Sequence, residues 1–236
     1  MATYQSICES VLEEANGRPV VFPSMSLGID PATNDYYVQD PTQRNIIRWV
    51  DDLYLQTQQR MLNARFMHKR GLFITTAQGT EEYLKPGIRE VARFSFYAVK
   101  DGQTARIPQQ VLDYDFWVQQ ERVRHFPESN PLWLIRKPDF KWLVYPPPSA
   151  VWRIYGEWWL KPTRFCESDE EPRWDEEYHD VLKWKALQLF AAEFSMSNDA
   201  AENPLMKRIA MMLPPLEKAF HQRYLEPIKP ARPLMS

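Results

Sequence analysis

Cysteine and glycine are both scarce in this chain of 236 residues. The two cysteines, Cys8 and Cys166, lie far apart in the sequence and show no pairing pattern. A disulfide framework is therefore not expected, and the composition fits assembly in a reducing compartment. Only 7 glycines are present. The sequence contains no glycine-rich phosphate loop, no dinucleotide-binding fingerprint and no G-x-S-x-G nucleophile turn.

The chain also lacks an excess of charge of either sign and lacks long apolar runs. Lysine and arginine total 29 against 31 acidic residues, for a formal net charge of -2. Nothing in this balance would draw the whole chain onto nucleic acid, so we do not expect phosphate neutralisation to be its main role. No stretch approaches the roughly 20 consecutive apolar residues of a membrane span, and the first residues do not resemble a signal peptide. No membrane partner is predicted.

Residues that would mark an enzyme or a metal site are few. None of the four histidines (His68, His125, His179 and His221) has a second histidine or a cysteine at metal-ligand spacing. We expect His179 to lie in an exposed, acidic first helical turn. We predict no catalytic residue, no cofactor and no metal. A glycan hydrolase would need a pair of carboxylates, and adjacent pairs occur at Glu81-Glu82 and Glu170-Glu171. Neighbouring side chains on a strand, however, face opposite ways.

Aromatic residues and prolines are plentiful by comparison. Aromatics make up 14% of the chain, including 9 tryptophans, and there are 20 prolines. Such an aromatic content favours broad packed or interfacial surfaces, because tryptophan and tyrosine bury a large area and keep a polar group. The prolines favour turns, edge strands and extended segments.

Helical patterns occupy the two ends of the chain. Apolar residues recur at helical spacing over residues 3–15, 41–66 and 174–194 and again from residue 204. Asp40-Pro41 and Asn203-Pro204 each supply an N-cap followed by a proline in the first turn. Pro214 and Pro215 predict a kink or break near Met211, because proline lacks an amide donor and its ring clashes one turn back.

The middle of the chain has strand patterns instead. We predict strands at residues 71–76, 91–99, 104–107, 133–136, 141–145 and 151–161, and a short helix at 111–124 that lies over the sheet. Residues 100–103 predict a hairpin turn, and the prolines at 146–148 a turn at the edge of a sheet. Within 151–161, Trp152 and Trp158 alternate with Arg153 and Trp159, which indicates one buried face and one partly wet face.

The predicted fold class is α+β: an antiparallel helical bundle with an inserted antiparallel β module and an extended C-terminal tail. We predict four segments, namely N-terminal helices at 1–66, the β module with a short helix at 67–165, C-terminal helices at 166–225 and a proline-rich arm at 226–236. Residues 18–40 are a predicted loop.

The predicted functional residues lie in the arm and the β module. The arm repeats proline every third residue and reads as an extended polyproline-like segment, either a frayed terminus or a docking arm. Its residues are Pro227, Ile228, Lys229, Pro230, Ala231, Arg232, Pro233, Leu234 and Met235. The tryptophans Trp142, Trp152, Trp158 and Trp159 are predicted to form the core of the β module or a subunit interface, rather than a sugar-binding platform.

The segment from Glu167 to Glu177 is strongly acidic. It has two interpretations. It is a solvated linker leading into a helix, or it is a negative surface that lets DNA slide past without sticking.

Several stretches of the chain resemble the adaptor, or connector, proteins of tailed bacteriophages. The strand candidate KWLVYPPP at 141–148 is followed by YGEWWLKP at 155–162, then by Glu171-Pro172 and Tyr178-His179. The helix candidate IRWVDDLYLQTQ at 47–58 also resembles the second helix of that family. The resemblance runs from about residue 42 to residue 224. The loop at 18–40 and the double proline depart from the pattern.

The resemblance implies a structural role without chemistry. The chain would form a ring of about twelve copies, a dodecamer, at the head–tail junction of the virion. Its partners would be itself, the portal protein gripped by the C-terminal arm, and a tail or nozzle protein below, with DNA passing transiently through. Assembly would take place in the host cytoplasm. Two alternatives stay open: another virion component, such as a tail or baseplate module, and a virion-associated cell-wall hydrolase.

Overall fold

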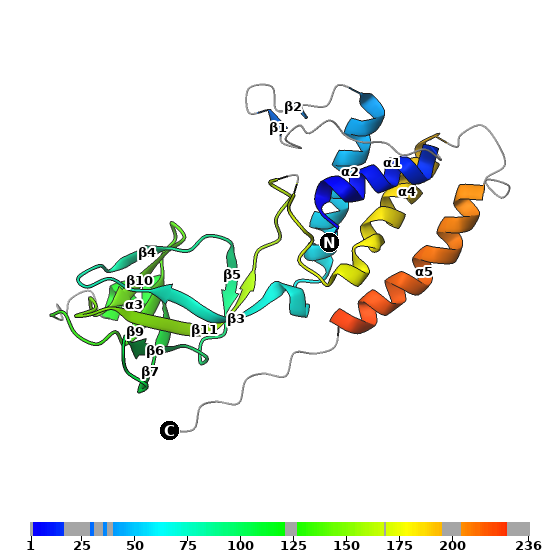
Figure 1. Cartoon of the computed structure of the whole chain (residues 1–236). Coiled ribbons are helices and arrows are strands. Elements are labelled where there is room, and N and C mark those ends of the chain that lie inside the picture. The colour runs from blue at the N-terminus through cyan, green and yellow to red at the C-terminus, as the bar shows by residue number, and fades with distance from the viewer. Residues whose placement is uncertain are drawn as a thin grey trace. The chain divides into compact units, whose positions relative to one another are not determined.

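The computed structural model describes residues 2–16, 29–30, 35–36, 40–120, 127–167, 169–194 and 204–225. The predicted arm lies outside these residues, as does most of the predicted loop at 18–40. The described part of the chain is a mixed α+β structure that divides into two compact units (Figure 1). Residues 2–66 and 162–225 form the helical unit, and residues 67–161 form the β unit.

Helix α4 (Asp180–Phe194) is the central element of the helical unit. It packs against α1 (Tyr4–Asn16), α2 (Pro41–Arg60) and α5 (Pro204–Tyr224), and α1 also packs against α2. A short strand pair, β1 (Ile29–Asp30) and β2 (Asp35–Tyr36), belongs to the same unit. The buried residues of α4 lie on most of its faces, since three helices surround it: Val181, Leu182, Trp184, Ala186, Leu187 and Ala191.

The start of α2 follows a local signal, while two other helix boundaries differ from the prediction. The Asp40 carboxylate accepts a hydrogen bond from the Thr42 amide at 2.8 Å, so the predicted cap of α2 is confirmed. Helix α2 ends at Arg60 rather than at residue 66. A turn and the 3-10 helix η1 (Arg65–Met67) follow it, and they bury Met61, Ala64, Phe66 and Met67, which would not all lie on one face of a continued helix. Helix α4 begins at Asp180 rather than at residue 174, after the 3-10 helix η2 (Glu176–Tyr178).

Of the predicted kink or break in the last helix, the break is wrong. Helix α5 runs without interruption through Pro214 and Pro215. Both prolines are exposed, so water can reach the carbonyl groups that lose their helical donors. The opposite face carries a buried apolar stripe at helical spacing, made of Ile209, Leu213, Phe220 and Tyr224.

The described residues of the β unit form two sheets. One has the strand order β4 (Glu82–Leu84), β10 (Lys141–Tyr145), β9 (Trp133–Arg136) and β8 (Gln110–Asp113). The other has the order β3 (His68–Thr75), β11 (Trp152–Leu160), β6 (Tyr97–Lys100) and β7 (Arg106–Pro108), while β5 (Ile88–Val91) pairs with the end of β11. All pairs are antiparallel except β8 with β9.

The parallel pair corrects the expectation of a purely antiparallel module. Residues 110–113 form strand β8, and the predicted helix at 111–124 starts only afterwards as α3 (Tyr114–Gln120). Strand β8, helix α3 and strand β9 therefore make a crossover, the connection that parallel neighbours require. The predicted strand at 91–99 is also two strands, β5 and β6, because residues 92–95 turn between them.

The predicted alternation in β11 is confirmed for the core side of the strand. Trp152, Ile154 and Trp158 are buried in one cluster, whereas the Arg153 side chain is exposed and pairs with Asp101 at 2.8 Å. Gly156 lies against the buried ring of Phe96, where an added Cβ would come within 2.4 Å of the ring carbons.

One side chain departs from this alternation. Glu157 falls on the side of β11 predicted to be partly wet, yet it is buried. Its carboxylate lies 3.3 Å from the Arg70 side chain and 3.5 Å from His68. The buried carboxylate thus has an arginine and a histidine side chain as polar neighbours, as a buried polar group requires.

Candidate functional site

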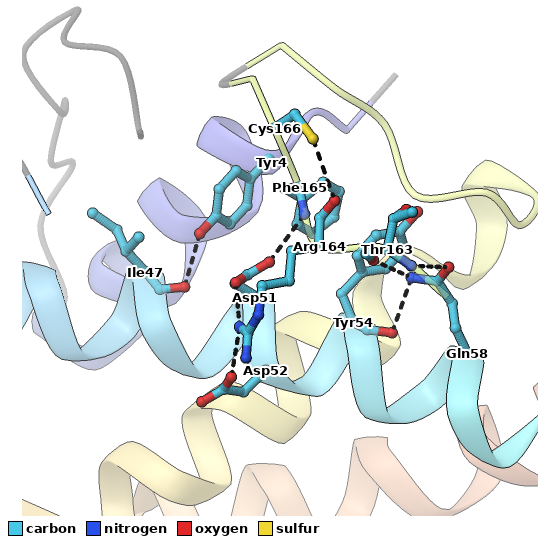
Figure 2. Close-up of polar contacts among 10 residues, drawn as sticks. All are labelled: Tyr4, Ile47, Asp51, Asp52, Tyr54, Gln58, Thr163, Arg164, Phe165 and Cys166. Atoms are coloured by element: carbon cyan, nitrogen blue, oxygen red, sulfur yellow. Dashed lines mark hydrogen bonds and ion pairs between the residues drawn. The ribbon is translucent and has the colours of Figure 1, made fainter. Parts of the chain in front are cut away.

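The segment that follows β11 in the chain, residues 162–179, crosses the helical unit, and we call it the crossing segment. Its Phe165 ring stacks between two tyrosines, with centroids 4.3 Å from Tyr4 of α1 and 3.9 Å from Tyr54 of α2. The Tyr4 hydroxyl in turn donates to the Ile47 carbonyl at 2.9 Å (Figure 2). The stack fixes the crossing segment onto both N-terminal helices.

An ion pair lies beside this stack. Arg164 donates to the Asp51 carboxylate at 2.5 Å and to Asp52 at 2.7 Å, and the Phe165 amide donates to Asp51 at 3.0 Å (Figure 2). Burial raises the pKa of Asp51, although the hydrogen bonds from Arg164 and Phe165 act in the opposite direction. The buried carboxylate therefore depends on Arg164 for its main charge-assisted partner.

Removing that partner should cost stability. We expect Arg164→Ala to lower the free energy of unfolding by about 1–3 kcal/mol, because Asp51 would stay buried without its cation while the half-exposed arginine itself loses little packing. Urea denaturation followed by circular dichroism measures the loss. The control Asp52→Ala removes the more exposed carboxylate and should cost under about 1 kcal/mol. Equal losses in the two variants would contradict this account.

A second set of hydrogen bonds connects two residues of the crossing segment, Thr163 and Arg173, to each other and to α2. The side-chain amide of Gln58 donates to the Thr163 carbonyl at 2.8 Å, and Arg173 donates to Gln58 at 2.9 Å and to the Thr163 hydroxyl at 2.7 Å. Between these ends, the Tyr4 amide donates to the Glu170 carbonyl at 2.8 Å. The backbone is thus tied to α1 and α2 at several points.

Carboxylates project from this anchored backbone. Glu167, Asp169 and Glu171 are all exposed, and we call these three residues the acidic ridge. The Glu170 carboxylate differs, since it turns back to accept a hydrogen bond from the Cys166 amide at 2.7 Å. The ridge is therefore a negative surface on a segment whose backbone is anchored to α1 and α2.

The prediction that His179 lies in an exposed turn is wrong. Its side chain is buried, with Nδ1 3.1 Å from the Ala2 carbonyl oxygen and Nε2 3.0 Å from the Trp174 carbonyl oxygen. Carbonyl oxygens only accept, so a ring nitrogen that carries hydrogen donates to one of these two backbone groups. His179 thereby ties the start of the chain to the crossing segment, and no local pattern in the sequence signals this role.

Helix α5 presents a second, quite different surface. Its outward side carries Lys207, Met211, Pro214, Pro215 and Lys218, all exposed, and we call this set the α5 outer face. It lies opposite the buried stripe of the same helix. The nearest acidic residue, Glu217, pairs with Lys185 of α4 at 2.8 Å. The α5 outer face thus combines cations with exposed apolar groups and has no carboxylate of its own.

The predicted site residues fall in three places. Trp142, Trp152 and Trp158 are buried in the core of the β unit, so none of them can form an exposed sugar platform. Trp159 is half-buried, and its ring centroid lies 5.0 Å from that of His68. The arm residues 227–235 lie outside the described part of the chain.

In the residues that the structure describes, no group of three or more His, Cys, Asp or Glu side chains is placed to hold a metal ion. None of the described helices has the length and apolar character that crossing a membrane requires. No protein-family model matches the chain, and no curated protein matches it.

Proposed function

We propose that the chain is a head-to-tail adaptor of a tailed bacteriophage, located at the head–tail junction of the virion. About twelve copies close into a ring, joining the portal protein to the tail or nozzle protein below and letting DNA pass. The helices form an antiparallel bundle that carries the inserted β module, and the proline-rich arm at 226–236 grips the portal. The protein acts through binding surfaces and performs no reaction.

One observation carries the proposal. The helical unit has two unlike exposed surfaces: the acidic ridge, on a segment anchored to α1 and α2, and the α5 outer face, on a helix that lies across α4 from α2 (Figure 1). A subunit with two different lateral surfaces can bind its neighbours head to tail, the arrangement that closes into rings.

The order of elements supports the same role. Strand β10 ends at the prolines 146–148, strand β11 carries Gly156-Glu157-Trp158-Trp159, and the acidic crossing segment leads to α4. This is the order that the resemblance to phage adaptors implies. The near-neutral charge of -2 suits a ring that DNA passes without binding tightly.

Deleting residues from Pro227 onward tests the role of the arm. We expect the shortened chain to fold and to lose portal binding, because an extended proline-rich segment loses little entropy when it lies along a partner. Binding is measured by the mass of complexes formed with purified portal, and folding by circular dichroism. The full chain is the control, and it should form a ring alone or on added portal.

Two outcomes count against this function. Portal binding that survives the deletion would remove the docking arm. A full chain that stays monomeric with portal present and degrades cell-wall substrate would replace the adaptor with an enzyme.

A further inference from the structure

We propose that the α5 outer face of one copy binds the acidic ridge of the next copy. This inference depends on the proposed function, because it identifies the surfaces through which the ring would close. The proposed binding partner of the α5 outer face is a second copy of this chain.

The first argument is the position of the two surfaces. Helix α4 packs against α1, α2 and α5, and Figure 1 shows α4 between α2 and α5. Residues 163–170 of the crossing segment are anchored on α1 and α2. Only the later part of the segment reaches α5, where the Asp175 amide donates to the Tyr224 hydroxyl at 2.7 Å. The acidic ridge and the α5 outer face are thus available to two different neighbours at once.

The second argument is charge. The acidic ridge contributes three exposed carboxylates, from Glu167, Asp169 and Glu171, while the α5 outer face contributes the ammonium groups of Lys207 and Lys218. Opposite potentials favour docking of unlike surfaces, and like charges disfavour two ridges or two α5 faces meeting. The pairing is therefore head to tail and not two-fold, which makes it compatible with ring closure.

The third argument is the chemistry between the two lysines. Met211 is 67% exposed and lies beside Pro214 and Pro215 on the same face. The prolines remove the amide donors that would bind the carbonyls of Ala210 and Met211 in an ordinary helix. The face thus offers exposed apolar area from Met211, Pro214 and Pro215 that a neighbouring copy can bury.

Charge reversal on each surface tests the pairing in the full chain. Lys207→Glu with Lys218→Glu, and separately Glu167→Lys with Glu171→Lys, should each raise the protein concentration needed for half-maximal ring formation by about tenfold or more. The four changes together set two lysines on the ridge, beside the unchanged Asp169, against two glutamates on the α5 outer face, and should recover most of the rings. Assembly of the unaltered chain should weaken as salt is raised, since exposed charges are screened. Mass photometry measures the ring fraction.

A matched control places the same charge change elsewhere. Lys69→Glu with Lys100→Glu alters the β unit and should leave assembly unchanged. Rings of unaltered stability in both charge-reversed variants would overturn the pairing while leaving the adaptor function in place. Loss of rings that the four-fold variant fails to recover would also overturn it. A full chain that forms no ring, alone or with portal, would instead count against the proposed function.

Discussion

Replacing Trp158 with alanine is expected to lower the free energy of unfolding of the β unit by about 3–5 kcal/mol. The indole is 7% exposed, and its centroid lies 5.1 Å from that of Phe73 in an edge-to-face contact. The Lys85 ammonium lies 5.3 Å from the same ring. The variant therefore loses a large buried area and leaves a cavity between the two sheets, which the surrounding strands can fill only in part.

Urea denaturation followed by circular dichroism gives the size of this loss. The matched control is Trp159→Ala, because the next residue along β11 faces the other side of the sheet and is only half-buried. Its loss should be clearly smaller. A loss below about 1 kcal/mol for Trp158→Ala would place that side chain at a surface instead of the core.

Replacing both Pro214 and Pro215 with alanine is expected to raise the stability of the helical unit by about 3 kcal/mol or more. Each proline sits inside α5, where it removes one backbone hydrogen bond and crowds the carbonyl one turn back. Both are exposed, so the substitution sacrifices no buried contact. Alanine restores the donors for the carbonyls of Ala210 and Met211 and has the highest helix propensity.

The control for this prediction is Pro41→Ala. Pro41 stands at the start of α2, where the missing amide would have no helical acceptor, so its replacement should change stability by under about 1 kcal/mol. Thermal unfolding and urea denaturation measure both variants. A gain below about 1 kcal/mol for the double variant would mean that α5 is not a regular helix around residue 214. If the double variant is more stable but assembles less well, the two prolines contribute to binding at the α5 outer face.

Local signals predicted much of the secondary structure. Asp40 and Pro41 predicted the start of α2, because a cap needs only residues adjacent in sequence. The alternation of Trp152 and Trp158 with Arg153 predicted which side of β11 is buried, because successive side chains on a strand point to opposite faces. The turn at 100–103 is also confirmed, since β6 and β7 pair across it.

Contacts between distant residues explain the errors. Pro214 does not end α5, because the apolar stripe of that helix packs on α4 and its exposed side tolerates the lost hydrogen bonds. His179 is buried, and its ring nitrogens contact the carbonyl oxygens of Ala2 and Trp174. Ala2 is 177 residues away in sequence, so no local pattern could predict this contact. Strand β8 pairs in parallel because α3 carries the chain across before β9 begins.

Some features of the candidate site could likewise be predicted from the sequence, and others could not. The sequence alone identified the acidic segment and the tryptophans of the β unit, since residue types and spacing are written in it. It left open whether the acidic segment was a solvated linker or a negative surface that DNA slides past. The tertiary structure shows how the segment is held, with Phe165 stacked between Tyr4 and Tyr54.

By itself, the sequence determined the starts of α2 and α5, the buried side of β11 and the mixed α+β composition of the chain, because each of these follows from neighbours within a few residues. The tertiary structure decided where the crossing segment lies, which carboxylates are buried and which side of α5 stays exposed. Those features depend on side chains brought together from opposite ends of the chain, and packing between them outweighs local preference.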